Sequence, residues 1–146
     1  MITLTKPEHF TGPLQAAGAV IMVDDKILLI KRSSDKAFGA NQWAVIGGKL
    51  DVGENFEIGM KREVFEEVGI DIQLGSVIKH VMFYHVPEVD SSYHLEYCLY
   101  LVEMDNRPEV IINSENSAYG WFSFDEMLTL DLIEDAKYCI EYLLSS

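Results

Sequence analysis

The chain has 146 residues, a usual length for one domain with one hydrophobic core. Hydrophobic residues make up 49% of it, too many for a disordered protein, and no apolar run approaches the roughly 20 residues of a membrane span. The formal net charge of −13 disfavours binding to nucleic acid, because an acidic surface repels phosphate backbones. These features predict a single domain over residues 1–146, with neither a nucleic-acid nor a membrane partner.

The N-terminal residues and the cysteines indicate where the protein resides. The first ten residues are polar and charged and lack the apolar segment of a signal peptide, so a cytoplasmic location is expected. Cys98 and Cys139 lie far apart in sequence and do not form a short-spaced metal-binding pair. We expect both to be buried, reduced thiols.

The first regular elements form a predicted hairpin. Ala16–Val23 and Lys26–Lys31 are apolar and rich in β-branched residues, and Asp24 and Asp25 stand between them as a tight turn. The stretch Gly39–Gly53 contains four glycines and is expected to be an irregular loop.

A helix is predicted over Phe56–Val68. Asn55 is suited to cap its first turn, and Gly69 stands where a left-handed C-terminal cap is expected. Val64 and Val68 are placed to pack into the core.

The second half of the chain combines strands with a closing helix. Two segments rich in Val, Ile, Tyr and Leu and one shorter segment are expected to be strands: Gly75–Val86, Tyr93–Met104 and Gly120–Ser123. Ser123 and Glu126 form a capping-box pattern that opens a short helix, and Leu132–Leu144 has apolar residues at helical spacing. Strands mixed with two substantial helices predict an α/β layered domain.

Three glutamates gather on one side of the helix predicted over Phe56–Val68. Each helical residue advances by about 100°, so Glu63, Glu66 and Glu67 fall within an arc of roughly 100°. Gly59 lies on the same side one turn earlier, where the lack of a side chain is expected to leave room for a ligand.

This grouping of glutamates is unfavourable for an isolated helix. Like charges three and four residues apart destabilise a helix by a few tenths of a kcal/mol each, and the helix dipole disfavours Glu66 and Glu67 near the C-terminus. A cation that accepts hard oxygen ligands, such as magnesium or manganese, would offset these costs. On the glutamates alone, a solvated acidic face is an equally good interpretation.

The residues around the glutamates decide between these interpretations. The segment Gly48–Ile70 reads GKLDVGENFEIGMKREVFEEVGI and resembles the Nudix box, Gly-x5-Glu-x7-Arg-Glu-U-x-Glu-Glu-x-Gly-U with U aliphatic, at every defined position. The chain is therefore identified as a member of the Nudix hydrolase family. The resemblance implies an α/β/α sandwich around a mixed β-sheet, with the box forming a loop, a helix and a loop.

The resemblance also implies roles for individual residues. A divalent cation, Mg²⁺ with Mn²⁺ as a substitute, would be held by three box glutamates: Glu63, Glu66 and Glu67. The backbone carbonyl of Gly47 would join them. Glu54 and Arg62 would pair and brace the loop against the helix, as an arginine beside a carboxylate cluster offsets repulsion and fixes orientation.

Two further features lie outside the box. Many family members carry a carboxylate several residues before a tryptophan, and here Glu115 stands six residues before Trp121. Glu115 is expected to be a further metal ligand or the catalytic base, the alternatives being Glu63 as the base and an ordinary exposed acid at position 115. Trp43–Gly48 resembles the family's Trp-x-x-Pro-Gly-Gly with Ile46 in place of proline, so this loop is expected to be less rigid.

Substrate contacts are predicted from residue type and position. Trp43 is a candidate for base stacking, His94 for facing a substrate pocket, and Lys31 and Arg32 for phosphate contacts at a strand end. Core packing for Trp43 and a solvated strand end for the two cations are the alternatives. Other residues with the same ambiguity are expected to serve packing: Phe38, Phe83, Tyr84, Tyr93, His80 and His85.

The resemblance implies a metal-dependent hydrolase that cleaves a diphosphate linkage in a nucleoside diphosphate-X compound. A nucleoside triphosphate, standard or oxidised, is the expected substrate, and nucleotide sugars, ADP-ribose and diadenosine polyphosphates are alternatives. A non-catalytic nucleotide-binding module is the rival function, but such modules usually lose box glutamates that this chain keeps. Family members are often dimers, so the resemblance allows a homodimer.

Overall fold

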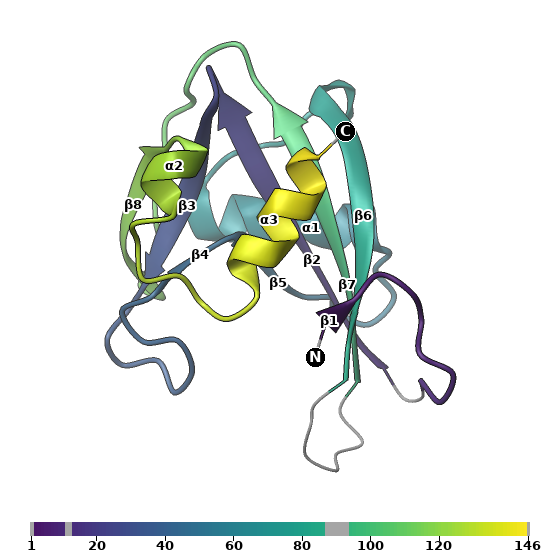
Figure 1. Ribbon diagram of the computed structural model, residues 1–146. Helices are drawn as coiled ribbons and strands as arrows, with labels where there is room; N and C mark the ends of the chain where they lie inside the picture. The colour runs from purple at the N-terminus through teal and green to yellow at the C-terminus, as the bar shows by residue number, and fades with distance from the viewer. Residues whose placement is uncertain (1, 11–12, 87–93, 146) are drawn as a thin grey trace.

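A single mixed β-sheet with helices on both of its faces forms the centre of the molecule (Figure 1). This computed structural model describes residues 2–10, 13–86 and 94–145. The sheet order is β1-β6-β7-β2-β3-β4, with β5 paired to β2 and β8 paired to β3. The strands are β1 (Ile2–Thr3), β2 (Pro13–Val23), β3 (Lys26–Arg32), β4 (Trp43–Ala44), β5 (Ile46–Lys49), β6 (Val77–His85), β7 (His94–Glu103) and β8 (Asn116–Phe122). The helices are α1 (Phe56–Val68), the 3₁₀ turn η1 (Leu74–Ser76), α2 (Phe124–Met127) and α3 (Ala136–Leu144).

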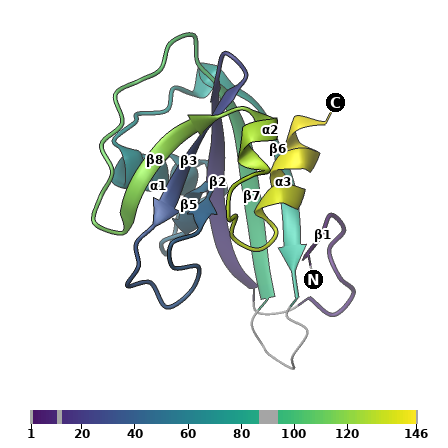
Figure 2. The same cartoon turned by 60° about the vertical axis from the view of Figure 1, so that its left-hand side comes forward.

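The two faces of the sheet bury separate hydrophobic cores, because successive strand residues point to opposite sides. On β3, Leu28 and Ile30 join the core that contains Val64 of α1, whereas Leu29 joins the core that contains Ile140 of α3. Figure 2 shows α1 and α3 on opposite sides of the sheet. Strands β2 and β7 run parallel and the other paired strands run antiparallel. This arrangement confirms the predicted α/β/α sandwich around a mixed sheet.

The predicted hairpin and helix caps are confirmed. Strands β2 and β3 are joined by Asp24 and Asp25, both with positive φ (49° and 62°), as in the two-residue turns whose twist suits a hairpin. The Asn55 side chain accepts a hydrogen bond from the backbone N–H of Ile58 (2.8 Å), and Gly69 ends α1 with a φ of 71°. Both hydrogen bonds of the capping box that opens α2 are present.

The glycine-rich stretch Gly39–Gly53 differs from the expected irregular loop, because it contains β4 and β5. In β5, Gly47 and Gly48 pair with Gly18 and Ala17 of β2. A Cβ atom at Gly47 would lie 2.5 Å from the carbonyl oxygen of Ala17. The glycines therefore permit a close approach of two strands, and Ile46, expected to loosen a loop, is a fully buried strand residue.

Several other boundaries differ from the predicted ones. The last helix begins at Ala136 instead of Leu132, because Leu132 forms a β-bridge with Trp43 before the helix starts. Strand β8 begins at Asn116 and is longer than the predicted Gly120–Ser123, and β6 begins at Val77, after η1. Tyr93 lies outside the described residues.

Two predictions about the chain as a whole can be compared with the structure. Cys98 and Cys139 are both buried and unpaired with each other, as expected for reduced thiols. Among the described residues, no helix has the length and apolar character needed to cross a membrane.

We predict that Leu143→Ala lowers the free energy of unfolding by about 2–5 kcal/mol, because Leu143 is fully buried in the core between α3 and the sheet. Urea denaturation of the purified variant measures this loss. Glu141→Ala, at an exposed position of the same helix, is the control and should change stability by no more than about 0.5 kcal/mol. Equal effects of the two substitutions would contradict the core assignment.

Candidate active site

The glutamates of α1 face the two glycines of β5. The backbone N–H of Gly47 donates a hydrogen bond to Glu67 Oε1 (3.2 Å). A Cβ atom at Gly48 would lie 2.6 Å from Glu63 Oε2, so a larger residue would displace that carboxylate. Because glycine has no side chain, two carboxylates of α1 can lie directly against the sheet at these positions.

The guanidinium of Arg62 is the centre of the carboxylate cluster. Its Nε and Nη2 donate to the two carboxylate oxygens of Glu54 at 2.7 and 2.9 Å, a bidentate pair that fixes orientation as well as charge. Its Nη1 donates to both Glu63 and Glu66 at 3.0 Å. A further bond to the carbonyl oxygen of Lys49 (3.0 Å) ties the same side chain to the end of β5. Arg62 thus links the loop before α1, the strand before that loop, and α1 itself.

Burial and hydrogen bonding give these carboxyl groups different pKa values. The Arg62 guanidinium, with the backbone N–H of Asp51, holds the pKa of Glu54 below its ordinary value. Burial raises the pKa of Glu63 despite its contact with Arg62. Burial also raises the pKa of Glu67 to about 7, and the donors to this carboxylate within the described part of the chain are neutral: the Gly47 amide and the Asn116 side chain.

The carboxylate cluster fits a divalent cation by its chemistry. Among the residues that the structure describes, no three Asp, Glu, His or Cys side chains are already grouped as a metal site. Arg62 occupies oxygens of Glu63 and Glu66, while the buried Glu67 has no positively charged partner within residues 2–10, 13–86 and 94–145. Hard carboxylate oxygens with unneutralised charge are the ligands that Mg²⁺ and Mn²⁺ accept.

Two asparagines that sequence reasoning did not identify fasten the neighbouring loop to α1. Asn116, 6% exposed, donates to Glu67 Oε2 (3.4 Å). Asn113 donates to the carbonyl oxygen of Glu66 (3.1 Å) and accepts from the backbone N–H of Glu115 (3.0 Å). Their adjacency to Glu115 in sequence is the only signal that could have indicated them.

Glu115 lies near the cluster but is not in direct contact with its arginine. Its side chain is 60% exposed and forms an ion pair with Lys36 at 3.5 Å. After burial, its negative charge is among the smaller causes that raise the pKa values of Glu63 and Glu67, which places it within electrostatic range of both. The structure therefore brings Glu115 to the same region as the box glutamates.

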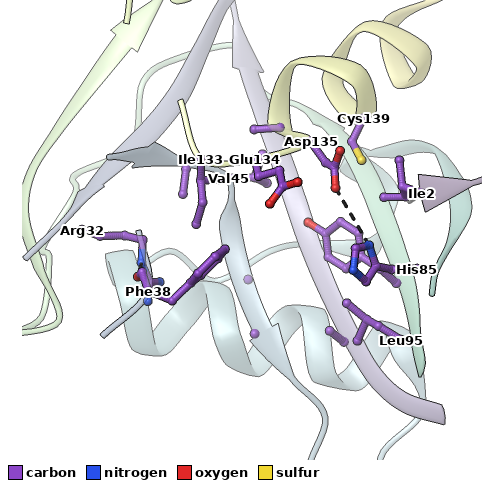
Figure 3. Close-up of a pocket in the computed structure, with 16 residues that line it drawn as sticks. Ile2, Arg32, Phe38, Val45, His85, Leu95, Ile133, Glu134, Asp135 and Cys139 are labelled. Atoms are coloured by element: carbon purple, nitrogen blue, oxygen red, sulfur yellow. Dashed lines mark hydrogen bonds and ion pairs between the residues drawn. The ribbon is translucent and has the colours of Figure 1, made fainter. Parts of the chain in front are cut away.

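A cavity of about 530 Å³ adjoins the cluster and shares Gly47 and Gly48 with it (Figure 3). This volume lies in the usual range of small-molecule sites, roughly 300–1,000 Å³. The lining comes from the strands, from the loop after β3 and from the start of α3. Its side chains include Arg32, Phe38, Val45, His85, Leu95, Tyr97, Ile133, Glu134, Asp135 and Cys139.

The predicted substrate contacts lie in different places. Arg32 lines the cavity, whereas Lys31, Trp43 and His94 are not among its lining residues. The Trp43 ring packs edge-on against Phe122, with centroids 5.0 Å apart. His94 stacks on Phe10 at 5.1 Å, and Lys31 pairs in β3 with Trp43 and Ala118.

Three residues differ from their expected roles: Gly59, His85 and Phe38, the last of which was expected to serve packing but is 62% exposed and lines the cavity. The space over Gly59 is not open to a ligand, because a Cβ atom there would lie 2.8 Å from the side chain of Leu50. His85, expected to serve packing alone, lines the cavity. The spacing of residues along β6 could not reveal that His85 lines a cavity, because the cavity is also lined by residues at the start of α3.

The fold and the cluster define a class of protein: an α/β/α sandwich whose helix α1 presents carboxylates beside a ligand-sized cavity. The family model described as NUDIX domain matches residues 12–143. The chain therefore belongs to the Nudix family and is an acid anhydride hydrolase.

The similar proteins agree in family and in fold. The oxidized purine nucleoside triphosphate hydrolase of Mus musculus is 31% identical over 111 residues, which span 75% of this chain and 67% of that protein. The nucleoside triphosphatase NudI of Enterobacter sp. (strain 638) is 29% identical over 81% of this chain and 87% of its own length. The crystal structure of a MutT NUDIX hydrolase from Burkholderia pseudomallei matches with a TM-score of 0.72 and 30% identity, covering 91% of this chain and 98% of that one.

We predict that Glu67→Gln stabilises the metal-free protein above neutral pH. The pKa of Glu67 is about 7 when folded and has its ordinary value of 4.5 when unfolded. Between these values the folded state holds a proton that the unfolded state has lost, so stability from this group falls as pH rises through that window. In chelator, thermal unfolding should show equal stability of variant and wild type at acidic pH and a higher Tm for the variant above neutrality.

Added Mg²⁺ provides a second test of the Glu67 carboxylate, through metal binding instead of proton binding. A cation that binds only the folded protein raises its Tm, so wild type should gain more than Glu67→Gln. Parallel pH profiles of wild type and variant in chelator would contradict the burial of an unneutralised Glu67.

We predict that Arg62→Lys lowers turnover by roughly 10- to 100-fold, because a lysine cannot make the bidentate contact with Glu54 while also bonding to Glu63 and Glu66. Steady-state kinetics with saturating Mg²⁺ measure the loss. Lys61→Arg on the same helix is the matched control and should stay near wild type. Turnover within a few-fold of wild type in Arg62→Lys would show that the brace is dispensable.

Proposed function

We propose that this Nudix hydrolase cleaves nucleoside triphosphates, standard or oxidised, in a reaction that requires Mg²⁺, with Mn²⁺ as a substitute. The observation that carries the proposal is the position of Gly47 and Gly48. They lie against carboxylates of α1 and also line a ligand-sized cavity. A nucleotide whose base enters the cavity would have its phosphates beside the cluster.

The residues proposed to hold the cation are Glu63, Glu66, Glu67, the carbonyl of Gly47, and Glu115. When bound, Mg²⁺ supplies positive charge against the diphosphate oxygens and the leaving phosphate. Glu63 or Glu115 accepts a proton from the attacking water. Arg62 and Glu54 hold the glutamates in place, and their hydrogen bonds support this positioning role.

The relatives support the substrate class. The mouse relative is named for oxidized purine nucleoside triphosphates and the Enterobacter relative for nucleoside triphosphates. The regions aligned with these relatives span 75% and 81% of this chain. The names of the two relatives favour triphosphates over nucleotide sugars, ADP-ribose and diadenosine polyphosphates as substrates.

We predict that Glu66→Gln lowers turnover at least about a hundredfold with the fold intact, because a cation-binding charge is lost next to the reacting phosphates. Glu115→Gln should slow turnover less severely. Circular dichroism checks the fold, and kinetics with a nucleoside triphosphate measure the loss. Glu141→Gln on the exposed face of α3 is the matched control. Turnover of folded Glu66→Gln within a few-fold of wild type would remove Glu66 from the metal site.

A substrate panel tests the proposed function directly. The panel contains standard and oxidised nucleoside triphosphates, a nucleotide sugar, ADP-ribose and a diadenosine polyphosphate, each with Mg²⁺ and with chelator. Mg²⁺-dependent cleavage that is fastest for a triphosphate supports the proposal. Faster cleavage of another panel member would overturn the substrate class, and binding without cleavage would favour a non-catalytic module.

A further inference from the structure

The loop between β3 and β4, residues 33–42, reaches both the cavity and the carboxylate cluster. Phe38 of this loop lines the cavity (Figure 3). Lys36, two residues earlier, forms an ion pair with Glu115, with Nζ and Oε1 3.5 Å apart. The loop therefore contributes one side chain to each of the two places that a bound nucleotide would contact.

Hydrogen bonds hold the start of this loop against the segment that carries Glu115. The backbone N–H of Ser33 donates to the carbonyl oxygen of Glu115 (3.0 Å), and Ser33 Oγ donates to the carbonyl oxygen of Ser114 (3.0 Å). The backbone N–H of Lys36 in turn donates to the carbonyl oxygen of Ser33 (3.3 Å). The pairing of Lys36 with Glu115 is therefore a consequence of how the loop folds.

The ion pair of Lys36 with Glu115 lies near the cluster and is weak enough to exchange. Glu115 is within electrostatic range of Glu63 and Glu67. The Lys36 ammonium is therefore near the proposed cation site. Its separation of 3.5 Å from Glu115 exceeds the roughly 2.7–2.9 Å of a charge-assisted hydrogen bond. The Glu115 side chain is also 60% exposed, and ion pairs at such positions contribute little to stability, so this pair opens at a small cost.

A cation and the Lys36 ammonium compete for Glu115, because two positive charges at one carboxylate repel each other. When Glu115 coordinates the cation, the ammonium is left without this partner. Mg²⁺ sites commonly combine carboxylates with substrate phosphates, so the phosphate chain of a bound nucleotide lies beside the same carboxylate. A lysine is a compact point charge on a flexible stem, which suits a change from a carboxylate to a phosphate.

We propose that Lys36 is a substrate-binding residue that exchanges partners. In the free protein it neutralises Glu115, and in the complex it binds the phosphate chain of the nucleotide after Glu115 has turned to the cation. The inference rests on the proposed function, since it assigns a phosphate contact at the same site. It gives the loss of Lys36 two effects of opposite sign: tighter binding of the cation to the free protein, and weaker binding of the nucleotide.

The first experiment measures Mg²⁺ binding without nucleotide, by calorimetry. Lys36→Met should tighten the Kd for Mg²⁺ by about two- to fivefold, because Glu115 no longer has a competing partner. In a Glu115→Gln background the same substitution should give no gain. Lys26→Met is the matched control: Lys26 pairs with Glu126 at 2.5 Å at the other end of β3, so the net charge changes equally while Mg²⁺ binding stays at its wild-type value.

The second experiment measures kinetics with GTP at saturating Mg²⁺. Lys36→Met should raise KM by about tenfold while kcat stays within about threefold of wild type, because a charged hydrogen bond to the phosphate chain is lost. Lys36→Arg, which keeps the positive charge, should restore KM to within about threefold of wild type. A merely structural role for Lys36 would neither tighten Mg²⁺ binding nor depend on the charge of the side chain.

Each outcome has a separate meaning. Unchanged or weaker Mg²⁺ binding in Lys36→Met, or a full gain that persists in the Glu115→Gln background, overturns the exchange of partners. An unchanged KM in Lys36→Met overturns the phosphate contact. Absence of GTP hydrolysis by wild type counts against the proposed function alone. Calorimetry with inorganic triphosphate and Mg²⁺ then decides the phosphate contact: weaker binding by Lys36→Met than by wild type supports it, and equal binding overturns it.

Discussion

The arrangement of the site depends on the contacts that one arginine makes with several carboxylates. Arg62 bonds to Glu54, Glu63 and Glu66 and to the carbonyl oxygen of Lys49. Without a cation, three negative charges on one turn of a helix repel one another, and the guanidinium offsets part of that repulsion at defined geometry. The same side chain joins β5, the loop after it and α1, so the position of the helix and the arrangement of its charges are set together.

Glu67 differs from the carboxylates that Arg62 neutralises. It is 7% exposed, so burial raises its pKa to about 7, and its hydrogen-bond donors in the described structure are neutral groups. A buried carboxylate without a cationic partner lowers stability at neutral pH. The fold retains this cost at a residue that we propose as a ligand of the cation.

The two glycines of β5 connect the chemistry of the cluster to the cavity. Their lack of side chains allows β5 to approach β2 and allows the α1 carboxylates to reach the sheet. Because the same residues line the cavity, a ligand there adjoins the cluster without crossing another layer of the protein. Asn113 and Asn116 add a second connection, from α1 to the loop that carries Glu115.

The local sequence determined much of the fold. The turn at Asp24 and Asp25, the cap at Asn55 and the helix end at Gly69 depend on backbone preferences of the residues themselves, and each was predictable. The spacing of Gly48–Ile70 likewise identified the family and the glutamates that α1 brings to one face.

Only the tertiary structure decided what depends on contacts between distant segments. The stretch with Gly47 and Gly48 appears as a loop in sequence and forms a strand because β2 offers a partner at close range. The last helix begins four residues later than its apolar spacing suggests, because Leu132 bridges to Trp43. His85 becomes a cavity residue because β6 and α3, far apart in the chain, meet at Asp135. Periodicity and spacing report on neighbours along the chain, whereas these features arise from neighbours in space.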